Sequence, residues 1–190
     1  LIKLCIILNS KNNFNFEDLD GNRIELINLK KVADIALLDM HDWSTNPKFF
    51  EYLEFPESKN IEGTQQQLDK MLSRMDEGEH YWCIKLKEKK QFIGTLRINE
   101  VDFRKKFCGL GYGINPEFQG KGLASESLQL ALNFLFKILK IQKISCLTMS
   151  LNLPSINLVK KIGFKQEGLL RNHYLDYKGN MHDAIIFGLL

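Results

Sequence analysis

A glycine-rich turn that leads directly into a long apolar segment is the part of the sequence best suited to chemistry. Residues 115–127 read NPEFQGKGLASES, with Gly120 and Gly122 on either side of Lys121. The first amides of a helix have no partner inside the helix, and the helix dipole favours negative charge beside them. Glycines leave room for a ligand to approach, and a lysine adds a cation. The turn suits a pyrophosphate; the alternative is a tight strand-to-helix turn without a ligand.

Two common nucleotide-binding motifs do not fit this turn. A Walker loop requires glycine where Asn115 stands, and it requires Ser or Thr where Gly122 stands. A dinucleotide fingerprint that begins at Gly109 requires a third glycine where Ile114 stands. Neither of these nucleotide-binding folds is therefore indicated.

The cysteines and histidines form no metal-binding pattern. The four cysteines are widely spaced, and three lie within apolar runs, as small buried residues do. No ligand spacing joins them to the four histidines. We therefore expect no metal site and a reducing compartment. The residues concerned are Cys5, Cys83, Cys108, Cys146, His41, His80, His173 and His182.

The composition is typical of a soluble globular protein. The chain has 190 residues, 44% of them hydrophobic and 26% charged, which predicts a single domain over residues 1–190. The net charge of +3 does not require an acidic partner, and no RNA-binding signature is present. Residues 1–8 are apolar but too short to span a membrane, and they lack a signal-peptide cleavage site. We expect a cytoplasmic protein that binds neither membranes nor nucleic acid directly.

The predicted elements follow a mixed α/β order. Alternating hydrophobicity predicts a hairpin over residues 16–29, an antiparallel meander at 80–87, 91–98 and 107–114, a strand at 143–149, and a closing hairpin at 163–177 and 181–190. Helical periodicity predicts helices at residues 30–41, 47–53, 62–75, 120–140 and 154–162. In the first helix, we expect Val32, Ile35 and Leu38 to share one face. In the long helix, the inward residues are expected to be Leu128, Ala131, Leu132, Leu135, Ile138 and Leu139.

Three segments resemble the GCN5-related N-acetyltransferase (GNAT) superfamily. Residues 119–124, QGKGLA, are similar to its Q/R-x-x-G-x-G/A loop, and GYGINPEFQGKGLASESL resembles the corresponding segment of its RimJ/RimL subfamily. The segments NLPSINLVKKIGFKQEGLLR and YKGNMHDAIIFGLL resemble two further segments of that subfamily. The resemblance covers about residues 20–190, so residues 1–19 form an N-terminal extension of unclear role.

The resemblance implies the GNAT fold, an α/β (α+β) architecture. Its central sheet is mixed and mostly antiparallel, with about seven strands and flanking helices. The fourth and fifth strands, here residues 107–114 and 143–149, would splay into a V-shaped gap. The pantetheine arm of acetyl-coenzyme A (acetyl-CoA) would lie in that gap like an added strand, with its pyrophosphate on residues 119–124.

The resemblance also implies roles for individual residues. Main-chain groups around Tyr112 to Ile114 would bind the pantetheine arm and polarise the thioester carbonyl. Ser155 would assist the departing thiolate, and Asn152 would bond the arm; the alternative for both is a helix-cap role. The residues expected to bind acetyl-CoA are Tyr112, Gly113, Ile114, Gln119, Gly120, Lys121, Gly122, Leu123, Ala124, Asn152, Ser155 and Asn157.

The sequence departs from the superfamily pattern at two catalytic positions. Val159 stands where many members have a tyrosine general acid, and Gly109 stands where many have a glutamate. Some RimL-like enzymes carry a glutamate after the E-G-x-x-R segment, where this chain has Tyr174 next to His173. We therefore take His173 and Tyr174 as catalytic candidates beside Ser155, with His173 as a base acting directly or through water. The alternative for His173 is an exposed histidine without a role.

The absence of an obvious base favours an acceptor that deprotonates easily. At pH 7, roughly a tenth of an α-amine with a pKa near 8 is neutral, against on the order of one lysine amine in a thousand or fewer. We therefore expect a monomer or homodimer that acetylates a protein N-terminus, as the RimJ/RimL resemblance implies for ribosomal proteins. The alternatives are a small-molecule amine, such as an amino acid, polyamine or antibiotic, and a coenzyme-binding module without catalysis.

The acceptor pocket is expected where the first two helices, their loop and the final hairpin meet. The loop comprises residues 42–58, in which Trp43, Phe50 and Tyr52 are expected to form core or lid packing. Arg171 and Asp183 match motif positions and are expected to brace the final hairpin.

Overall fold

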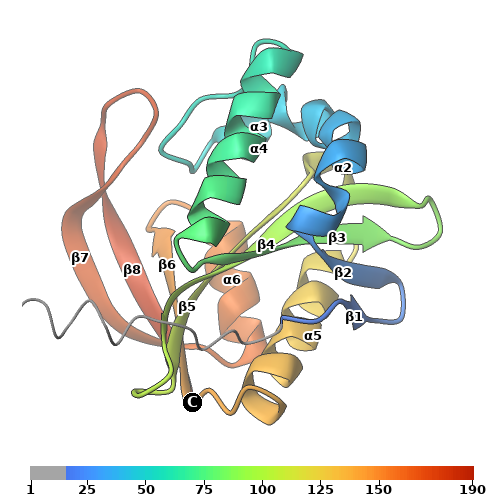
Figure 1. Cartoon of the computed structure of the whole chain (residues 1–190). Coiled ribbons are helices and arrows are strands. Elements are labelled where there is room, and N and C mark those ends of the chain that lie inside the picture. Colours follow the sequence, from blue (N-terminus) through green and yellow to red (C-terminus); the bar gives the residue numbers. More distant parts are fainter. Residues whose placement is uncertain (1–15) are drawn as a thin grey trace, which may run out of the picture.

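The computed structural model describes residues 16–190, which form one eight-stranded sheet with helices on both faces (Figure 1). The strands are β1 (Leu19–Asp20), β2 (Ile24–Asn28), β3 (His80–Leu86), β4 (Gln91–Asp102), β5 (Phe107–Ile114), β6 (Lys143–Met149), β7 (Lys165–Leu175) and β8 (Met181–Leu189). The helices are α2 (Leu29–Ser44), α3 (Pro47–Phe50), α4 (Ile61–Asp76), η1 (Pro116–Phe118), α5 (Leu123–Lys137) and α6 (Leu153–Ile162).

The sheet has the order β1-β2-β3-β4-β5-β6-β8-β7, and every neighbouring pair except β5–β6 is antiparallel. The expected mixed, mostly antiparallel architecture is therefore confirmed, and the two-residue β1 makes eight strands where about seven were expected. Of the expected extension at residues 1–19, residues 1–15 lie outside the described residues, as does Cys5, and Leu19 belongs to the sheet.

The predicted V-shaped gap between the fourth and fifth strands lies between β5 and β6. These strands pair in parallel at Phe107–Lys143, Cys108–Ile144 and Gly109–Ser145, and their pairing ends there. Beyond Gly109, β5 continues to pair with β4 as far as Ile114. Strand β6 pairs with β8 as far as Met149, so each strand follows a different neighbour and the two diverge (Figure 1).

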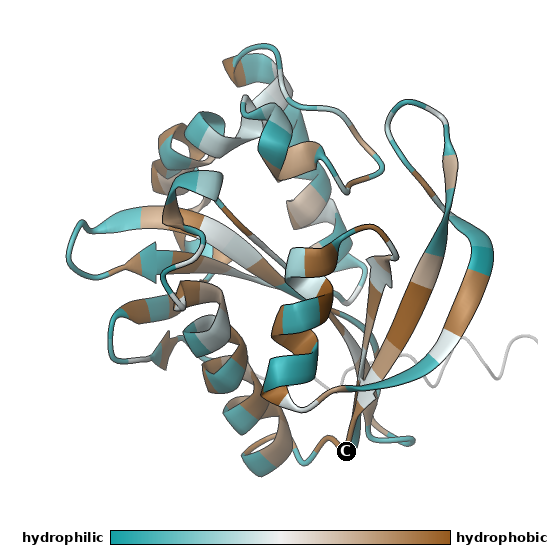
Figure 2. Ribbon diagram, turned by 180° about the vertical axis from the view of Figure 1, so that it is seen from behind, coloured by the Kyte–Doolittle hydropathy of each residue, from teal (hydrophilic) through white to brown (hydrophobic). Residues whose placement is uncertain are grey.

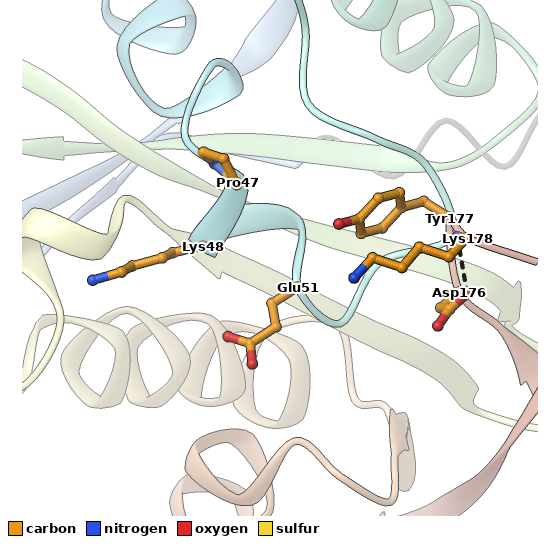
Figure 3. Close-up of a pocket in the computed structure, with 6 residues that line it drawn as sticks. All are labelled: Pro47, Lys48, Glu51, Asp176, Tyr177 and Lys178. Carbon is orange, nitrogen blue, oxygen red and sulfur yellow. Dashed lines mark hydrogen bonds between the residues drawn. The ribbon is translucent and has the colours of Figure 1, made fainter. Parts of the chain in front are cut away.

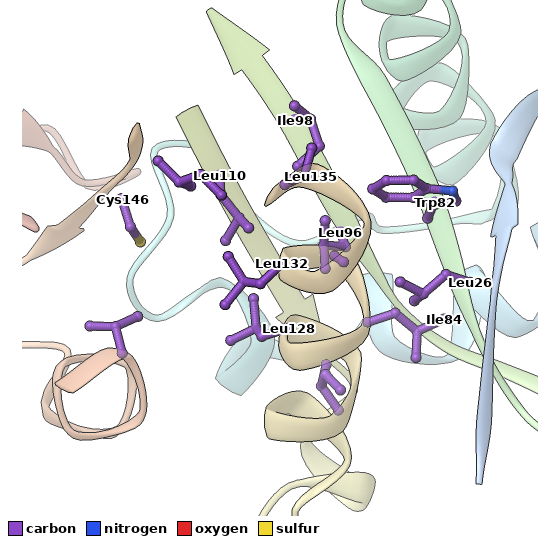
Figure 4. Close-up of a cluster of buried hydrophobic side chains, with 14 of the residues drawn as sticks. Leu26, Trp82, Ile84, Leu96, Ile98, Leu110, Leu128, Leu132, Leu135 and Cys146 are labelled. Carbon is purple, nitrogen blue, oxygen red and sulfur yellow. The ribbon is translucent and has the colours of Figure 1, made fainter. Parts of the chain in front are cut away.

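Hydrophobic side chains cover both faces of the sheet. On one face, helices α5 and α6 pack on the central strands, and we call this cluster the α5-side core (Figure 4). Hydrophobic and hydrophilic segments alternate along both helices, as expected of amphipathic helices packed on a sheet (Figure 2). On the other face, α2 and α4 form the α2-side core. Strand β3 serves both: Trp82 and Ile84 belong to the α5-side core, whereas Tyr81 and Cys83 belong to the α2-side core.

The three residues expected to share one face of the first helix are not all buried. Val32 is buried, but the Ile35 side chain is 68% exposed and that of Leu38 is 73% exposed. Each step of three residues along a helix falls about 60° short of a full turn, so a run of such steps leaves the buried face. The buried hydrophobic residues of α2 instead follow the mixed three- and four-residue spacing of a helix: Leu29, Val32, Ala36, Met40 and Trp43.

The long helix is shorter than predicted, because it begins at Leu123 and ends at Lys137 rather than covering residues 120–140. Leu128 and Leu135 are buried as expected. Ile138 was expected to point inward but is 64% exposed, because it is the C-cap residue where the chain leaves the helix.

Two alanine substitutions in this segment test which of its side chains are buried. Leu128→Ala is expected to lower the free energy of unfolding by about 2–5 kcal/mol, since it leaves a cavity in the α5-side core. The control Ile138→Ala removes an exposed side chain and is expected to change the free energy by less than about 0.5 kcal/mol. Urea unfolding followed by circular dichroism measures both. Equal losses in the two variants would contradict this assignment of the buried face.

Candidate functional site

The loop between β5 and α5 is shaped by two glycines in the left-handed region. Gly120 has φ 73° and Gly122 has φ 76°, a conformation that residues with a Cβ rarely adopt. A Cβ at Gly120 would meet no atom within 4 Å, so its glycine serves the backbone conformation and leaves the space beside it open. Gly122 is the N-cap residue of α5, and no side chain caps the helix.

The backbone amides of this loop have no protein partner. Between Gly120 and Ala124, no N–H group donates a hydrogen bond to any atom of residues 16–190. Unpaired amides at a helix N-terminus attract an anion through hydrogen bonds and the helix dipole. The loop therefore has the donors, the space and the field that a pyrophosphate requires.

An ion pair that the sequence did not reveal holds the loop in place. The Arg23 guanidinium donates from Nη1 to the carbonyl oxygen of Lys121 at 2.9 Å and from Nε to Glu126 Oε2 at 2.8 Å. The backbone N–H of Arg23 also donates to Glu126 Oε1. Burial acts to raise the pKa of Glu126, but its hydrogen bonds to Arg23 outweigh burial and lower that pKa below its ordinary value.

The side chains of Gln119 and Lys121 brace the loop rather than extend over its amides. Gln119 Nε2 donates to the carbonyl oxygen of Ile114 at 3.0 Å, which ties the loop to the end of β5. Lys121 Nζ donates to the carbonyl oxygen of Glu117 at 2.9 Å and lies 5.1 Å from the centre of the Phe118 ring. The cation that the sequence suggested beside the anion site is thus folded back onto η1.

The open edge of β5 lies next to this loop. From residue 110 onward, within the part of the chain that the structure describes, β5 pairs with β4 but not with β6. Tyr112, Gly113 and Ile114 therefore lie in the stretch of β5 that faces the gap. The Phe49 ring occupies the place where a Cβ of Gly113 would be, since that atom would lie 2.8 Å from Phe49 Cζ.

The N-terminus of α6 brings Ser155 to Tyr112. The Ser155 Oγ and the Tyr112 hydroxyl lie 3.0 Å apart, in hydrogen-bond contact between α6 and β5. Burial raises the pKa of Tyr112 to about 12. The cap of α6 is Asn152, whose Oδ1 accepts from the backbone N–H of Ser155 at 3.1 Å. The alternative cap role is therefore taken by Asn152, and the Ser155 hydroxyl is used elsewhere.

The remaining candidates on α6 and β7 lie in different surroundings. Asn157 is exposed on α6, whereas Val159, at the usual tyrosine position, is fully buried in the α5-side core. His173 is exposed, and no hydrogen bond or ion pair joins it to another of residues 16–190. Burial, with the nearby charges of Glu54 and Cys146, raises the pKa of Tyr174 to about 12. Tyr174 therefore stays protonated at neutral pH and can donate a hydrogen bond.

A pocket of about 260 Å³ lies between α3 and the tip of the β7–β8 hairpin, where the acceptor was expected (Figure 3). Its lining comprises Pro47, Lys48, Glu51, Asp176, Tyr177 and Lys178. Trp43 and Phe50 are buried core residues, as the packing prediction expected, and Tyr52 is half-buried.

Hydrogen bonds within the hairpin hold the carboxylate of Asp176. His182 Nε2 lies 2.8 Å from Asp176 Oδ2, and the backbone N–H groups of Lys178 and Asn180 donate to Oδ1 at 2.9 and 2.8 Å. The contact with His182 is the largest of the interactions that lower the pKa of Asp176 well below its usual range. Asp183 braces the same hairpin as expected, since its Oδ1 accepts from the backbone N–H of Asn172 at 3.0 Å.

Two further kinds of site are not found in the described part of the chain. No group of three or more His, Cys, Asp or Glu side chains there has the arrangement of a metal site. Within residues 16–190, no helix has the length and apolar character needed to cross a membrane.

The ion pair between Arg23 and Glu126 predicts a pH-dependent effect on stability. Arg23→Met is expected to lower the free energy of unfolding at pH 7 by on the order of 1 kcal/mol, a modest value because the Arg23 side chain is half-exposed. The Glu126 carboxyl has a lowered pKa in the folded protein. Its contribution to the free energy of unfolding is therefore complete above its ordinary pKa and is lost as pH falls through its lowered pKa. The difference between wild type and variant should therefore shrink in acid.

Urea unfolding between pH 7 and pH 3 measures this difference. The control is Lys105→Met, which removes an exposed pair with Asp102 at 3.7 Å and should change stability little at any pH. If the free energy of unfolding of Arg23→Met stays below that of wild type by the same amount down to pH 3, the role of Glu126 is contradicted.

Comparison with known proteins agrees with this geometry. N-acetyltransferase p20 of Bacillus licheniformis, whose function is uncharacterized, is 30% identical over 149 residues, which cover 78% of this chain and 83% of that protein. In Escherichia coli, spermidine N(1)-acetyltransferase is 33% identical over 98 residues, and the ribosomal protein uS5-alanine N-acetyltransferase is 33% identical over 104 residues. The match to the spermidine enzyme covers 52% of this chain and 50% of that protein. The match to the ribosomal-protein enzyme covers 54% of this chain and 53% of that protein.

Solved structures show the same fold. A GCN5-related N-acetyltransferase from Brucella melitensis superposes with a TM-score of 0.83 at 19% identity, covering 92% of this chain and 78% of that one. A spermidine N-acetyltransferase from Vibrio cholerae, in complex with CoA and spermine, gives a TM-score of 0.73 at 23% identity. The superposition covers 88% of this chain and 95% of that one. The family model described as acetyltransferase (GNAT) domain matches residues 23–165. Because this match covers well over half of its length, the chain belongs to the GNAT family of acetyltransferases.

Proposed function

We propose that this N-acetyltransferase transfers the acetyl group of acetyl-CoA to the α-amino group of a polypeptide N-terminus. The observation that carries the choice of acceptor is the charge of the pocket between α3 and the β7–β8 hairpin. Its lining has Lys48 and Lys178 against Glu51 and Asp176, and the Asp176 carboxylate is already held by hydrogen bonds. Such a pocket gives a polycation little attraction, whereas a peptide carries one terminal amine and many neutral amides.

We infer that free backbone groups of the loop and of β5 bind the acetyl donor. In the proposal, amides from Gly120 to Ala124 hold the pyrophosphate, and the open edge of β5 from Tyr112 to Ile114 pairs with the pantetheine arm. The unpaired state of these groups supports the assignment, because free amides at a helix N-terminus can donate hydrogen bonds to an anion. Asn152 and Asn157 are the proposed side-chain contacts on α6.

Residues of the chain then act on the thioester carbonyl, the departing sulfur and the amine. The amine nitrogen bonds to the thioester carbon, the carbon–sulfur bond breaks, and the amine releases a proton while the sulfur leaves as a thiolate. A backbone amide near Ile114 stabilises the developing oxyanion, and the Ser155 hydroxyl donates a hydrogen bond to the departing sulfur. Tyr174 keeps its proton at neutral pH and is therefore not the base. In the proposal, His173 takes the amine proton, directly or through water.

A second candidate acceptor is a polyamine. Spermidine N(1)-acetyltransferase of Escherichia coli is as similar to this chain as the ribosomal-protein enzyme is, at 33% identity over about half the chain. The loop after α3 also carries Glu51, Glu54 and Glu57, which can attract a cation. The third possible function is that of a coenzyme-binding module without catalysis. Steady turnover with any acceptor would exclude it.

A panel of acceptors tests the proposed function. Peptides with a free N-terminal Ala or Ser, the same peptides with a blocked N-terminus and an internal lysine, and spermidine are each supplied with acetyl-CoA, and the released thiol is measured. The free N-terminal peptides are expected to give a kcat/KM at least tenfold above the other acceptors. Their rate is expected to level off near pH 8, where the α-amine becomes neutral, whereas a lysine acceptor would accelerate to about pH 10.

The same panel contains the contradicting outcomes. A higher kcat/KM for spermidine than for every free N-terminal peptide would replace the proposed acceptor by a polyamine. Acetylation of the blocked peptide at its lysine with equal efficiency would show that the site does not select α-amines.

A further inference from the structure

The hydroxyl pair of Tyr112 and Ser155 joins two elements of the proposed donor site. Tyr112 lies on β5 beyond its last pair with β6, and Ser155 is the third residue of α6. Their oxygen atoms are 3.0 Å apart, and Tyr112 packs against the α5-side core. The pair thus lies at the wall of the gap, next to the stretch of β5 without a β6 partner.

The number of hydrogens in the pair limits what Ser155 can do. Each hydroxyl has one hydrogen to donate, and one of the two must donate across the 3.0 Å contact. If Ser155 donates to Tyr112, the serine has no hydrogen left for another acceptor. If Tyr112 donates, the serine hydrogen is free, and the serine O–H becomes a stronger donor because hydrogen bonds in a chain polarise one another.

The surroundings favour donation by Tyr112. Burial raises the pKa of Tyr112 to about 12, so the phenol is protonated throughout the range in which an acetyltransferase works. The helix cap does not require the serine hydroxyl, because Asn152 accepts from the Ser155 backbone N–H. The Ser155 hydroxyl is therefore free to turn its hydrogen into the gap.

We propose that Tyr112 is a positioning residue for acetyl transfer: its hydroxyl donates to Ser155 Oγ, fixes the serine rotamer and directs the serine hydrogen to the departing sulfur. This inference rests on the proposed function, since it requires a thiolate that leaves in the gap. It goes beyond the family resemblance, which assigned backbone binding to residue 112.

Tyr112 acts by hydrogen bonding and does not give up its proton. An ordinary thiol has a pKa near 8.5, well below the pKa of about 12 to which burial raises Tyr112, so moving the proton from Tyr112 to the thiolate would be unfavourable. A chain of two hydrogen bonds, from Tyr112 to Ser155 and from Ser155 to sulfur, stabilises the thiolate without that cost. The sulfur then takes its proton from solvent.

A double-mutant cycle separates this role from a merely structural one. The variants Tyr112→Phe, Ser155→Ala and the double variant are compared with wild type by kcat with the best acceptor of the panel. Tyr112→Phe is expected to lower kcat about tenfold and Ser155→Ala about a hundredfold. The double variant is expected to be within twofold of Ser155→Ala, since Tyr112 acts through the serine. The affinity for coenzyme A, measured by calorimetry, should be unchanged in Tyr112→Phe.

The control variant changes a tyrosine outside the proposed site. Tyr81→Phe removes a buried tyrosine hydroxyl from β3 on the other face of the sheet, and it should leave kcat within twofold. The inference is overturned if Tyr112→Phe keeps at least half of the wild-type kcat, or if the two single losses multiply in the double variant. Turnover by wild type in the same assay establishes acetyl transfer independently of this outcome.

A second measurement needs no acceptor and no turnover. In Ser155→Cys, prepared with Cys5→Ser, the new thiol occupies the serine position, and a donor at Tyr112 stabilises its thiolate. Adding Tyr112→Phe is expected to raise the pKa of this thiol by about 0.5–1 unit, as read from the pH dependence of its alkylation rate. The buried Cys83, Cys108 and Cys146 do not interfere, because burial raises the pKa of each to about 12. An unchanged thiol pKa would overturn the proposed direction of donation.

Discussion

Backbone groups without protein partners are the constraint on which the donor side of this structure depends. Within residues 16–190, the amides from Gly120 to Ala124 have no protein partner, and β5 has no strand beside it on its β6 side beyond Gly109. Such groups bond to water when they are exposed, and together they form one continuous row of donors and acceptors that a ligand can use in place of water. The surrounding elements hold that region open: Gln119 ties the loop to β5, and Arg23 ties it to the hairpin before β2.

Each of the two proposed substrate sites is supported by its own hydrophobic core. The α5-side core holds the donor loop and the N-terminus of α6, which carry the groups proposed to contact acetyl-CoA. The α2-side core holds α2, and α3 after it meets the β7–β8 hairpin at the proposed acceptor pocket. Strand β3 contributes to both cores, so the sheet links the two proposed sites.

Local sequence patterns predicted the elements better than the contacts between them. The strands at residues 107–114 and 143–149 were predicted with their observed bounds, because turn residues limit short apolar runs on both sides. The glycines at 120 and 122 also marked the loop correctly, since positive φ angles are a local requirement. Burial was less predictable: Ile35 and Leu38 are apolar and exposed, because the direction of a helix face depends on what packs against it.

Contacts between distant residues left no signal in the sequence. Arg23 and Glu126 are 103 positions apart, and Tyr112 and Ser155 are 43 apart, so no spacing rule could have joined them. The resemblance proposed a catalytic role for Ser155 and a backbone role for Tyr112, and it gave no sign of the contact between their hydroxyls or of the contacts of Lys121. A flexible lysine finds the nearest carbonyl and ring, which here belong to Glu117 and Phe118.

Amide chemical shifts test the central claim, that the unpaired N–H groups of the loop bind a pyrophosphate. Nitrogen-15 spectra of the protein are recorded during titration with coenzyme A and, separately, with pantetheine, which lacks the pyrophosphate. Coenzyme A is expected to move the amide protons of residues 120–124 strongly downfield, whereas pantetheine should leave them in place. Saturating coenzyme A with those amides unmoved would contradict the claim.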